Sequence, residues 1–181
     1  MLDEATKELG IDKSTLNPVT TAEVGNIFKF GTGKSEAMGI YFTDEEGQQK
    51  PIYLASYGIG ITRVMGVIVE KFADEKGIVW PESVAPFRVY LARLGNDAET
   101  VKEADTLYER LQSDGVSVLY DDSDKRPGEK FADADLLGIP HRIVVSSRTI
   151  EAGNYEYKGR SQSEATHISY DELQKRLTNP K

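Results

Sequence analysis

Along the first 72 residues, the spacing of hydrophobic positions changes from strand-like runs to a helical repeat. Three apolar runs, residues 23–30, 36–43 and 51–57, are separated by short polar or glycine-containing connections, which is typical of an antiparallel sheet. From residue 61 to residue 72, apolar side chains recur every three or four positions, as on one face of a helix. The pattern therefore predicts a small three-stranded sheet followed by an amphipathic helix, with a short helix at residues 2–9 before them.

After residue 86, strand-like and helix-like stretches alternate along the chain. This order implies parallel strands joined by right-handed crossovers, to which a hairpin and a last helix are added. Glycine, proline and capping residues mark the ends of the helices. The predicted strands are residues 87–94, 116–120, 142–146, 155–158 and 166–169, and the predicted helices are residues 96–114, 128–137 and 169–177.

The segment between these two halves has a different composition. Residues 73–86 contain two prolines, a glycine and Trp80, the only tryptophan, which fits a linker anchored by one aromatic side chain. We expect Trp80 to pack between domains. The sequence thus predicts three parts, namely a first domain at residues 1–72, a linker at 73–86 and a second domain at 87–181.

The charge, the cysteine and histidine counts and the length of the apolar runs exclude several classes of protein. The formal net charge of −8 argues against a broadly basic surface for nucleic acids, although it leaves room for a local basic patch. The chain has no cysteine and only two histidines, so we expect neither disulfides nor a metal site. No apolar run is long enough to span a membrane. We therefore expect a cytoplasmic protein without membrane contacts.

Residues 57–63, Tyr-Gly-Ile-Gly-Ile-Thr-Arg, lie where the third predicted strand meets the amphipathic helix. Gly58 and Gly60 would let the backbone turn tightly and let a flat ligand approach without an intervening Cβ. Arg63 falls off the apolar helix face, where its guanidinium can bind phosphate oxygens. On spacing alone, a strand–helix corner with a surface arginine is the simpler interpretation, because two glycines are a weak signal.

These seven residues resemble motif 3 of class II aminoacyl-tRNA synthetases. Further stretches, in the same order along the chain, resemble the bacterial type of prolyl-tRNA synthetase and the signature of its anticodon-binding domain. The resemblance runs from about residue 20 to the end, and several motifs in order are far more specific than one. The stretches are residues 23–28, 41–63, 77–81, 84–87, 121–135 and 137–141.

In this family the motif 3 arginine binds the γ-phosphate of a bent ATP, and the resemblance assigns that catalytic role to Arg63. Its charge would stabilise the departing pyrophosphate while the amino-acid carboxylate attacks the α-phosphorus. Gly58 and Gly60 would form the floor beneath the adenosine. ATP with Mg²⁺ is thus implied as a substrate of the complete enzyme, and we expect no tightly bound cofactor in this chain.

The resemblance also implies a pocket for prolyl-adenylate that includes Glu23, Asn26, Phe28 and Ser56. Ser56 stands where many bacterial members carry cysteine, and Asn26 stands where some relatives have histidine. For Glu23 and Phe28, packing within the sheet is the alternative to direct contact with the substrate.

A second group of candidates surrounds the predicted helix at residues 128–137. Asp124 and Arg126 precede this helix and Lys130 lies in its first turn. A helix amino terminus favours phosphate, and Arg and Asp side chains can read the edges of unstacked bases in RNA loops. The resemblance implies that these residues bind the anticodon stem-loop of proline tRNA. The alternative is a solvated run of charges that caps the helix.

The resemblance implies an α/β chain with an α+β amino-terminal part: a partial antiparallel sheet of the class II synthetase type, then a βαβαβ anticodon-binding domain with a mixed sheet. Motifs 1 and 2, the proline loop and the editing domain have no counterpart in these 181 residues. We therefore expect a truncated enzyme or one piece of a split enzyme, inactive alone, whose full-length relatives are homodimers acting on proline, ATP and proline tRNA. The other hypothesis is a non-catalytic, synthetase-like protein that binds tRNA or another RNA, or serves as an accessory protein.

Overall fold

The computed structural model describes residues 2–178 of the chain. It divides into two compact units, Met1–Val64 and Met65–Lys181. The division falls inside a helix, α3, whose bounds Ile61–Phe72 agree with the predicted helix. In the described part of the chain, no helix combines the length and the apolar character that a membrane-crossing segment requires.

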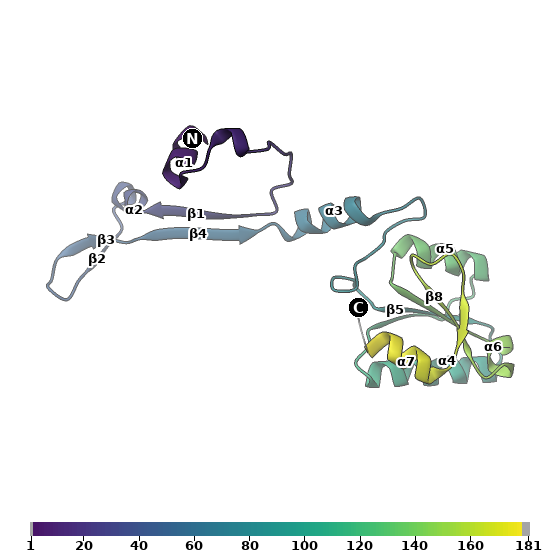
Figure 1. The fold of residues 1–181 in the computed structure, drawn as a ribbon. Helices are drawn as coiled ribbons and strands as arrows, with labels where there is room; N and C mark the ends of the chain where they lie inside the picture. The colour runs from purple at the N-terminus through teal and green to yellow at the C-terminus, as the bar shows by residue number, and fades with distance from the viewer. Residues whose placement is uncertain (1, 179–181) are drawn as a thin grey trace. The chain divides into compact units, whose positions relative to one another are not determined.

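The first unit consists of short helices and two small sheets (Figure 1). Strand β1 pairs antiparallel with β4, and β2 pairs antiparallel with β3, so the two hairpin-like sheets are separate. The predicted helix at residues 2–9 is confirmed as α1. The elements are α1 (Leu2–Leu9), a 3-10 helix (Lys13–Thr15), β1 (Gly25–Gly31), α2 (Gly33–Met38), β2 (Tyr41–Thr43), β3 (Gln49–Pro51), β4 (Leu54–Ile59) and the start of α3.

The predicted strand at residues 36–43 is wrong over its first half, where the chain forms α2. Residues 34–38 contain good helix formers, and Gly39 adopts the left-handed conformation, φ 69°, that commonly ends a helix. Ser35 on this helix is fully buried, and its hydroxyl donates a hydrogen bond to the backbone carbonyl of Ile52. This bond anchors α2 to the chain just before β4, and only residues 41–43 are left to form a strand.

The second unit contains a five-stranded sheet with the order β6-β5-β7-β8-β9. Strands β6, β5 and β7 are parallel, while β8 and β9 are antiparallel. The predicted βαβαβ order and mixed sheet are therefore confirmed. The elements are β5 (Val89–Leu94), α4 (Ala98–Ser113), β6 (Val118–Asp121), α5 (Pro127–Leu137), β7 (His141–Ser146), α6 (Ser147–Glu151), β8 (Tyr155–Gly159), β9 (Thr166–Ile168) and α7 (Tyr170–Thr178).

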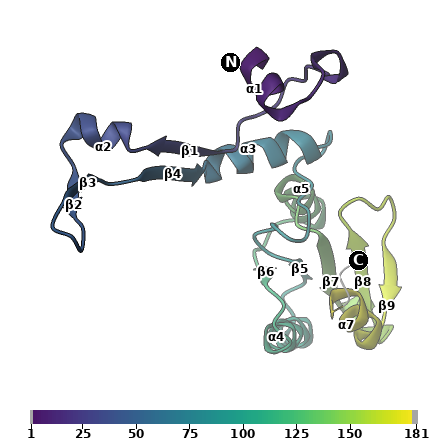
Figure 2. The same cartoon turned by 60° about the vertical axis from the view of Figure 1, so that its left-hand side comes forward.

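Helices cover both faces of this sheet, with α5 over one face and α4 and α7 over the other (Figures 1 and 2). The alternation of side chains along β5 shows the two layers directly. Val89 and Leu91 pack in the larger core with Leu107 of α4, whereas Tyr90 packs in the smaller core with Ala134 of α5. The apolar spacing of the sequence thus corresponds to two cores on one sheet.

Local sequence signals account for the helix ends. The Asp97 carboxylate caps α4 by accepting a 2.9 Å hydrogen bond from the N–H of Thr100, and Ser169 and Glu172 form a capping box at the start of α7. Helix α6 was not predicted. It has only five residues and starts directly at the end of β7, where the Ser146 hydroxyl caps it, so it is too short to show a helical period.

Candidate functional site

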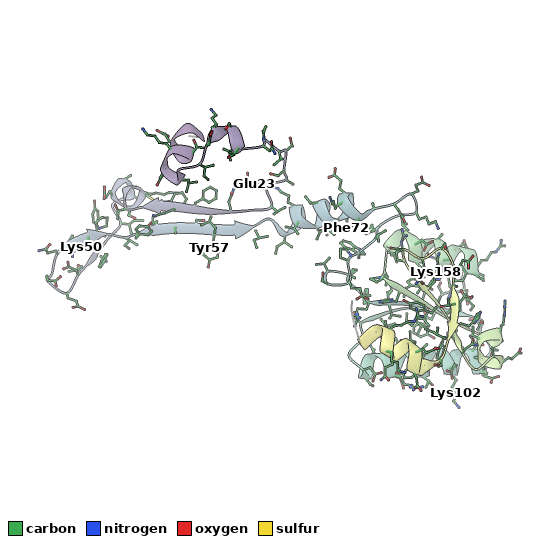
Figure 3. The ribbon with its side chains drawn as sticks, viewed as in Figure 1. Glu23, Lys50, Tyr57, Phe72, Lys102 and Lys158 are labelled. Atoms are coloured by element: carbon green, nitrogen blue, oxygen red, sulfur yellow. The ribbon has the colours of Figure 1, made fainter. Side chains whose placement is uncertain are left out.

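The first group of candidate residues lies on the paired strands β1 and β4. Their register places Asn26 opposite Gly58 and Phe28 opposite Ser56. Residues directly opposite each other, and residues two positions apart, point to the same face of a sheet. The structure therefore brings these four candidates onto one face, while Tyr57, labelled in Figure 3, belongs to the other.

Glu23 and Arg63 meet where β1 begins and α3 starts. Nη1 of Arg63 donates a 2.5 Å hydrogen bond to the backbone carbonyl of Glu23. The Glu23 carboxylate in turn accepts a hydrogen bond from the side-chain amide of Asn26. The N–H of Gly60 donates to the carbonyl of Val24 at 2.8 Å, which holds the start of α3 beside β1. These contacts bring Arg63 next to the candidate pocket residues.

Gly58 and Gly60 leave space beside the backbone, and neither adopts a conformation that only glycine favours. Neither Gly58 nor Gly60 has a positive φ, so the short connection from β4 to α3 does not use the left-handed conformation that favours glycine. A Cβ added at Gly58 would meet no other atom within 4 Å, whereas one at Gly25 would come within 3.0 Å of the Gly58 carbonyl oxygen. A hollow of about 530 Å³ runs along residues 25–27 and 57–59. The face beside Gly58 is open, as the approach of a flat ligand requires.

The same strand pair exposes large apolar side chains. Ile27 and Tyr57 are 86% and 85% exposed, and Ile59 and Ile61 are also largely exposed. A two-stranded sheet is marginally stable alone, and contiguous apolar surface of this kind usually marks a place where other protein packs. The first unit is therefore suited to contact further protein along these strands.

The second group of candidates surrounds the carboxyl end of β5. Strand β6 lies on one side of β5 and β7 on the other, so the direction of winding reverses at β5. In open α/β sheets, ligands bind outside the carboxyl ends of the strands at such a switch point. The loops that follow β5 and β6 carry Asn96 and Asp124 to this edge, and the loop after β6 leads into α5.

Lys130 is not on the surface, and the expectation that it faces a ligand needs correction. Its side chain is 1% exposed, and Nζ donates to the backbone carbonyls of Arg93 at 2.8 Å and Asp121 at 3.0 Å. Lys130 and Ala134 are four residues apart on the face of α5 that packs against the sheet. The ammonium therefore joins the ends of β5 and β6 and is used within the fold.

Sequence reasoning missed Arg93 and Asn96, which tie the two loops together. Nη2 of Arg93 donates to the Asn96 side-chain oxygen at 3.0 Å and to the Asp122 carbonyl at 2.8 Å. The amide of Asn96 donates to the Asp124 carboxylate at 2.7 Å. The signal that could have found them is topological, because the predicted parallel strands place the residues after 94 beside those after 121.

Asp121 anchors the loop from inside. Its carboxylate accepts hydrogen bonds from the Tyr90 hydroxyl and from the N–H and hydroxyl of Ser123, and Nζ of Lys130 lies 3.4 Å away. Burial alone would raise the pKa of Asp121, but these hydrogen bonds and the lysine charge lower it to about 2. Burial and the bond to Asp121 raise the pKa of Tyr90. Asp121 thus accepts these hydrogen bonds as a carboxylate near neutral pH.

Asp124 and Arg126 are both exposed at the entrance to α5, and the structure brings these two candidates together. The N–H of Arg126 donates to the Glu129 carboxylate at 2.9 Å, so the helix is capped without using the arginine side chain. Beside this entrance lies a hollow of about 440 Å³ with Leu119, Tyr120 and Leu136 among its lining residues. The site thus combines exposed charges with an apolar hollow.

No metal centre is formed by the described residues, since no three potential ligand side chains among them gather in one place. The candidate side chains themselves offer hydrogen bonds and charge.

Comparison with known proteins connects this geometry to a family. The family model described as "Anticodon binding domain" matches residues 88–179. Among curated relatives, "Proline--tRNA ligase" of Burkholderia ambifaria (strain ATCC BAA-244) is 45% identical over 168 residues, covering 92% of this chain and 29% of the relative. The protein of the same name from Burkholderia cenocepacia (strain HI2424) is 48% identical over 151 residues, covering 82% of this chain and 26% of the relative.

A solved structure gives the same result in three dimensions. "Crystal Structure of Prolyl-tRNA Synthetase from Cryptosporidium parvum complexed with L-Proline and AMP" matches with a TM-score of 0.75 and 28% identity, covering 86% of this chain and 33% of that one. The chain spans 26–29% of the length of the two curated relatives. By the match over residues 88–179 and the shared fold, the chain belongs to the anticodon binding domain family, as found in the proline–tRNA ligases.

Proposed function

We propose that this chain acts in the attachment of proline to its tRNA, as the part of a proline–tRNA ligase that recognises the anticodon and contributes motif 3 to the catalytic domain. The observation that carries the proposal is the cluster of side chains at the switch point beside β5, in a domain that belongs to an anticodon-binding family. The names of the relatives supply proline and tRNA as substrates.

Recognition of the anticodon is assigned to the entrance of α5. Asp124 and Arg126 are exposed and can read base edges by hydrogen bonds, while the hollow lined by Leu119 and Leu136 can receive the ring of an unstacked base. The net charge of −8 gives little non-specific attraction to RNA. Affinity should therefore depend on a few specific contacts, and it should be selective.

Lys130 takes a positioning role in this proposal. Its buried ammonium holds the Arg93 and Asp121 carbonyls, and Arg93 in turn holds Asn96, which bonds Asp124. The chain of contacts runs from the core to the exposed loop. Lys130 would thus shape the site without touching RNA.

The catalytic contribution is assigned to Arg63 in the complete enzyme. Its guanidinium would bind the γ-phosphate of ATP and stabilise the pyrophosphate that leaves as the proline carboxylate attacks the α-phosphorus. The open face beside Gly58 would receive the adenosine, and Asn26, Phe28 and Ser56 share that face as candidates for the adenylate pocket. Mg²⁺ would enter with ATP as substrate.

The remaining assignments rest on the same family membership. Residues 1–72 would belong to the catalytic domain, residues 73–86 to the connection and residues 87–181 to the RNA-binding domain. The exposed apolar strands β1 and β4 would pack against other parts of the complete enzyme, which we expect to be a cytoplasmic homodimer. The alternative, a non-catalytic RNA-binding protein, would have no use for Arg63 together with Gly58 and Gly60 in a motif 3 stretch.

A comparison of whole tRNAs tests the proposal. The purified chain is titrated with a labelled proline tRNA transcript and with a transcript for another amino acid, each at two salt concentrations. We expect tighter binding of the proline tRNA, with a preference that persists at the higher salt because it rests on base contacts. Equal affinities for both tRNAs at both salt concentrations would contradict the proposal.

A further inference from the structure

The carboxyl end of α5 is capped by residues from outside its own helix. The last backbone carbonyls of a helix lack partners within the helix and need others. Here the N–H of Ile78 donates to the Leu136 carbonyl at 3.2 Å, the Trp80 indole donates to the Leu137 carbonyl at 3.0 Å, and the Trp80 N–H donates to the Gly138 carbonyl at 3.2 Å. We call residues 74–80, which supply these donors, the capping segment.

Two glycines allow the capping segment to approach α5 this closely. Gly138 ends the helix with φ 71°, and a Cβ there would lie 2.1 Å from the carbonyl oxygen of Ile78. Gly77 has φ 143°, and a Cβ there would lie 2.5 Å from the Cα of Leu136. Since no side chain fits at either position, the two backbones are in direct contact. A glycine on each side of the contact allows this approach, so the capping segment is packed firmly against α5.

An ion pair secures the capping segment at its start. The guanidinium of Arg160, whose side chain is 4% exposed, donates to both oxygens of Asp74 at 2.8 and 2.6 Å, and its Nε donates to the Asp135 carbonyl at 2.9 Å. Asp74 also accepts from the N–H groups of Lys76 and Gly77, which closes the turn. Arg160 follows β8, so it clamps the segment and the last turn of α5 to the sheet.

The segment has therefore more than a linking function. It lies outside residues 88–179, which match the domain family, yet it belongs to the same compact unit as α5. Helix α5 has 11 residues, a rod of about 16 Å, and its other end carries the entrance with Arg126. A rigid helix that is fixed at one end transmits its position to the other.

We propose that Asp74, Arg160 and the capping segment are positioning elements of the anticodon site, which set the place of Arg126 by fixing the far end of α5. This inference rests on the proposed function for its RNA partner. The capping contacts themselves do not depend on that function, so the two can fail separately.

The test uses the full chain with Arg160→Gln, Asp74→Asn and the conservative Arg160→Lys. Two readouts are taken at a temperature where each variant is folded: hydrogen exchange of the amides at residues 121–130, and affinity for proline anticodon stem-loops with native or substituted anticodon bases. For Arg160→Gln and Asp74→Asn we expect faster exchange and a preference for the native loop reduced roughly three- to tenfold, the equivalent of one hydrogen bond. Arg160→Lys should fall between these variants and wild type, because it keeps the charge but loses the bidentate fork.

A matched control is Asp114→Asn, which removes another surface carboxylate that bonds Tyr170 and Gln174 between α4 and α7, on the opposite face of the sheet. It should leave both readouts unchanged. If Arg160→Gln lowers stability but leaves the exchange of residues 121–130 and the preference at wild-type values, the capping contacts are only structural and the inference is wrong. If wild type shows no preference between loops, the proposed function fails, and unchanged exchange in the variants would still overturn the positioning role.

Discussion

Nζ of Lys130 lies 2.8 Å from the backbone carbonyl oxygen of Arg93, inside the domain and shielded from solvent. This contact, with the 3.0 Å bond to Asp121, joins the two strand ends that carry the exposed part of the site. Loss of a lysine that binds RNA phosphate changes the salt dependence of RNA affinity. Loss of a lysine that only binds carbonyls in the core does not.

Lys130→Met separates these roles. Methionine keeps the stem but leaves the Arg93 and Asp121 carbonyls without the ammonium, and each unpaired buried group costs about 1–3 kcal/mol. We expect a lower free energy of unfolding in urea and weaker binding of the native stem-loop, with an unchanged slope of log affinity against log salt. A slope reduced by about one, as expected for a lost phosphate contact, with stability intact, would show that Lys130 touches RNA.

Arg126→Ala and Asp124→Ala should act selectively on the native anticodon. If these side chains read base edges, each loss costs about 1–3 kcal/mol on the native loop and much less on a loop with altered anticodon bases. Lys102→Ala is the control, because it removes an exposed charge from α4 (Figure 3). Titration of labelled stem-loops measures all three variants. Equal losses on native and altered loops would make the two residues general contacts.

Arg63→Ala should slow adenylate formation in the complete enzyme. Removal of a donor that stabilises developing charge typically lowers the rate roughly a hundredfold or more. Proline-dependent exchange of pyrophosphate into ATP measures this step, and binding of the stem-loop should not change. Lys71→Ala, which removes a cation from the last turn of the same helix, should leave the rate near that of wild type. An unaltered rate in Arg63→Ala would contradict the catalytic role and leave Arg63 with only its structural hydrogen bond to Glu23.

The ion pair of Asp74 should appear in the pH dependence of stability. The hydrogen bonds from Arg160 lower the pKa of Asp74 below its ordinary value of 3.8, despite the opposing effect of burial. A lowered folded-state pKa stabilises the protein above the unfolded pKa, and this stabilisation is lost as pH falls through that value toward the folded one. Wild type should therefore lose more stability than Asp74→Asn between pH 5 and pH 3, values chosen to bracket the ordinary pKa. Parallel losses in urea unfolding would contradict this assignment.

The sequence predicted most of the second unit because its signals are local and repeated. The apolar period, with glycines such as Gly138 and capping residues at the helix ends, predicts the strands and helices of this unit apart from α6. In the first unit, a short run at residues 36–38 fits a strand or a helix equally well, so the pattern predicts a strand where the structure has α2, which ends at Gly39. Short elements without a full helical period give pattern analysis too few positions.

The site was only half accessible to sequence reasoning. Asp124 and Arg126 could be chosen because they lie in one charged stretch, but the partners Arg93 and Asn96 come from 28 or more residues earlier and meet the stretch only through parallel pairing. Lys130 was misplaced because a charged residue near a helix start is ordinarily exposed. Its burial depends on carbonyls from two other strand ends, which no local pattern contains.

Hybrid stem-loops test whether the anticodon bases direct binding. One hybrid places the proline anticodon on an unrelated stem, and the other places an unrelated anticodon on the proline stem. Both are titrated against the wild-type chain at one salt concentration. We predict that the first hybrid binds nearly as tightly as the native stem-loop and the second roughly tenfold or more weakly, as expected for the loss of one good base contact. Equal binding of the two hybrids, or affinity that follows the stem, would contradict the account.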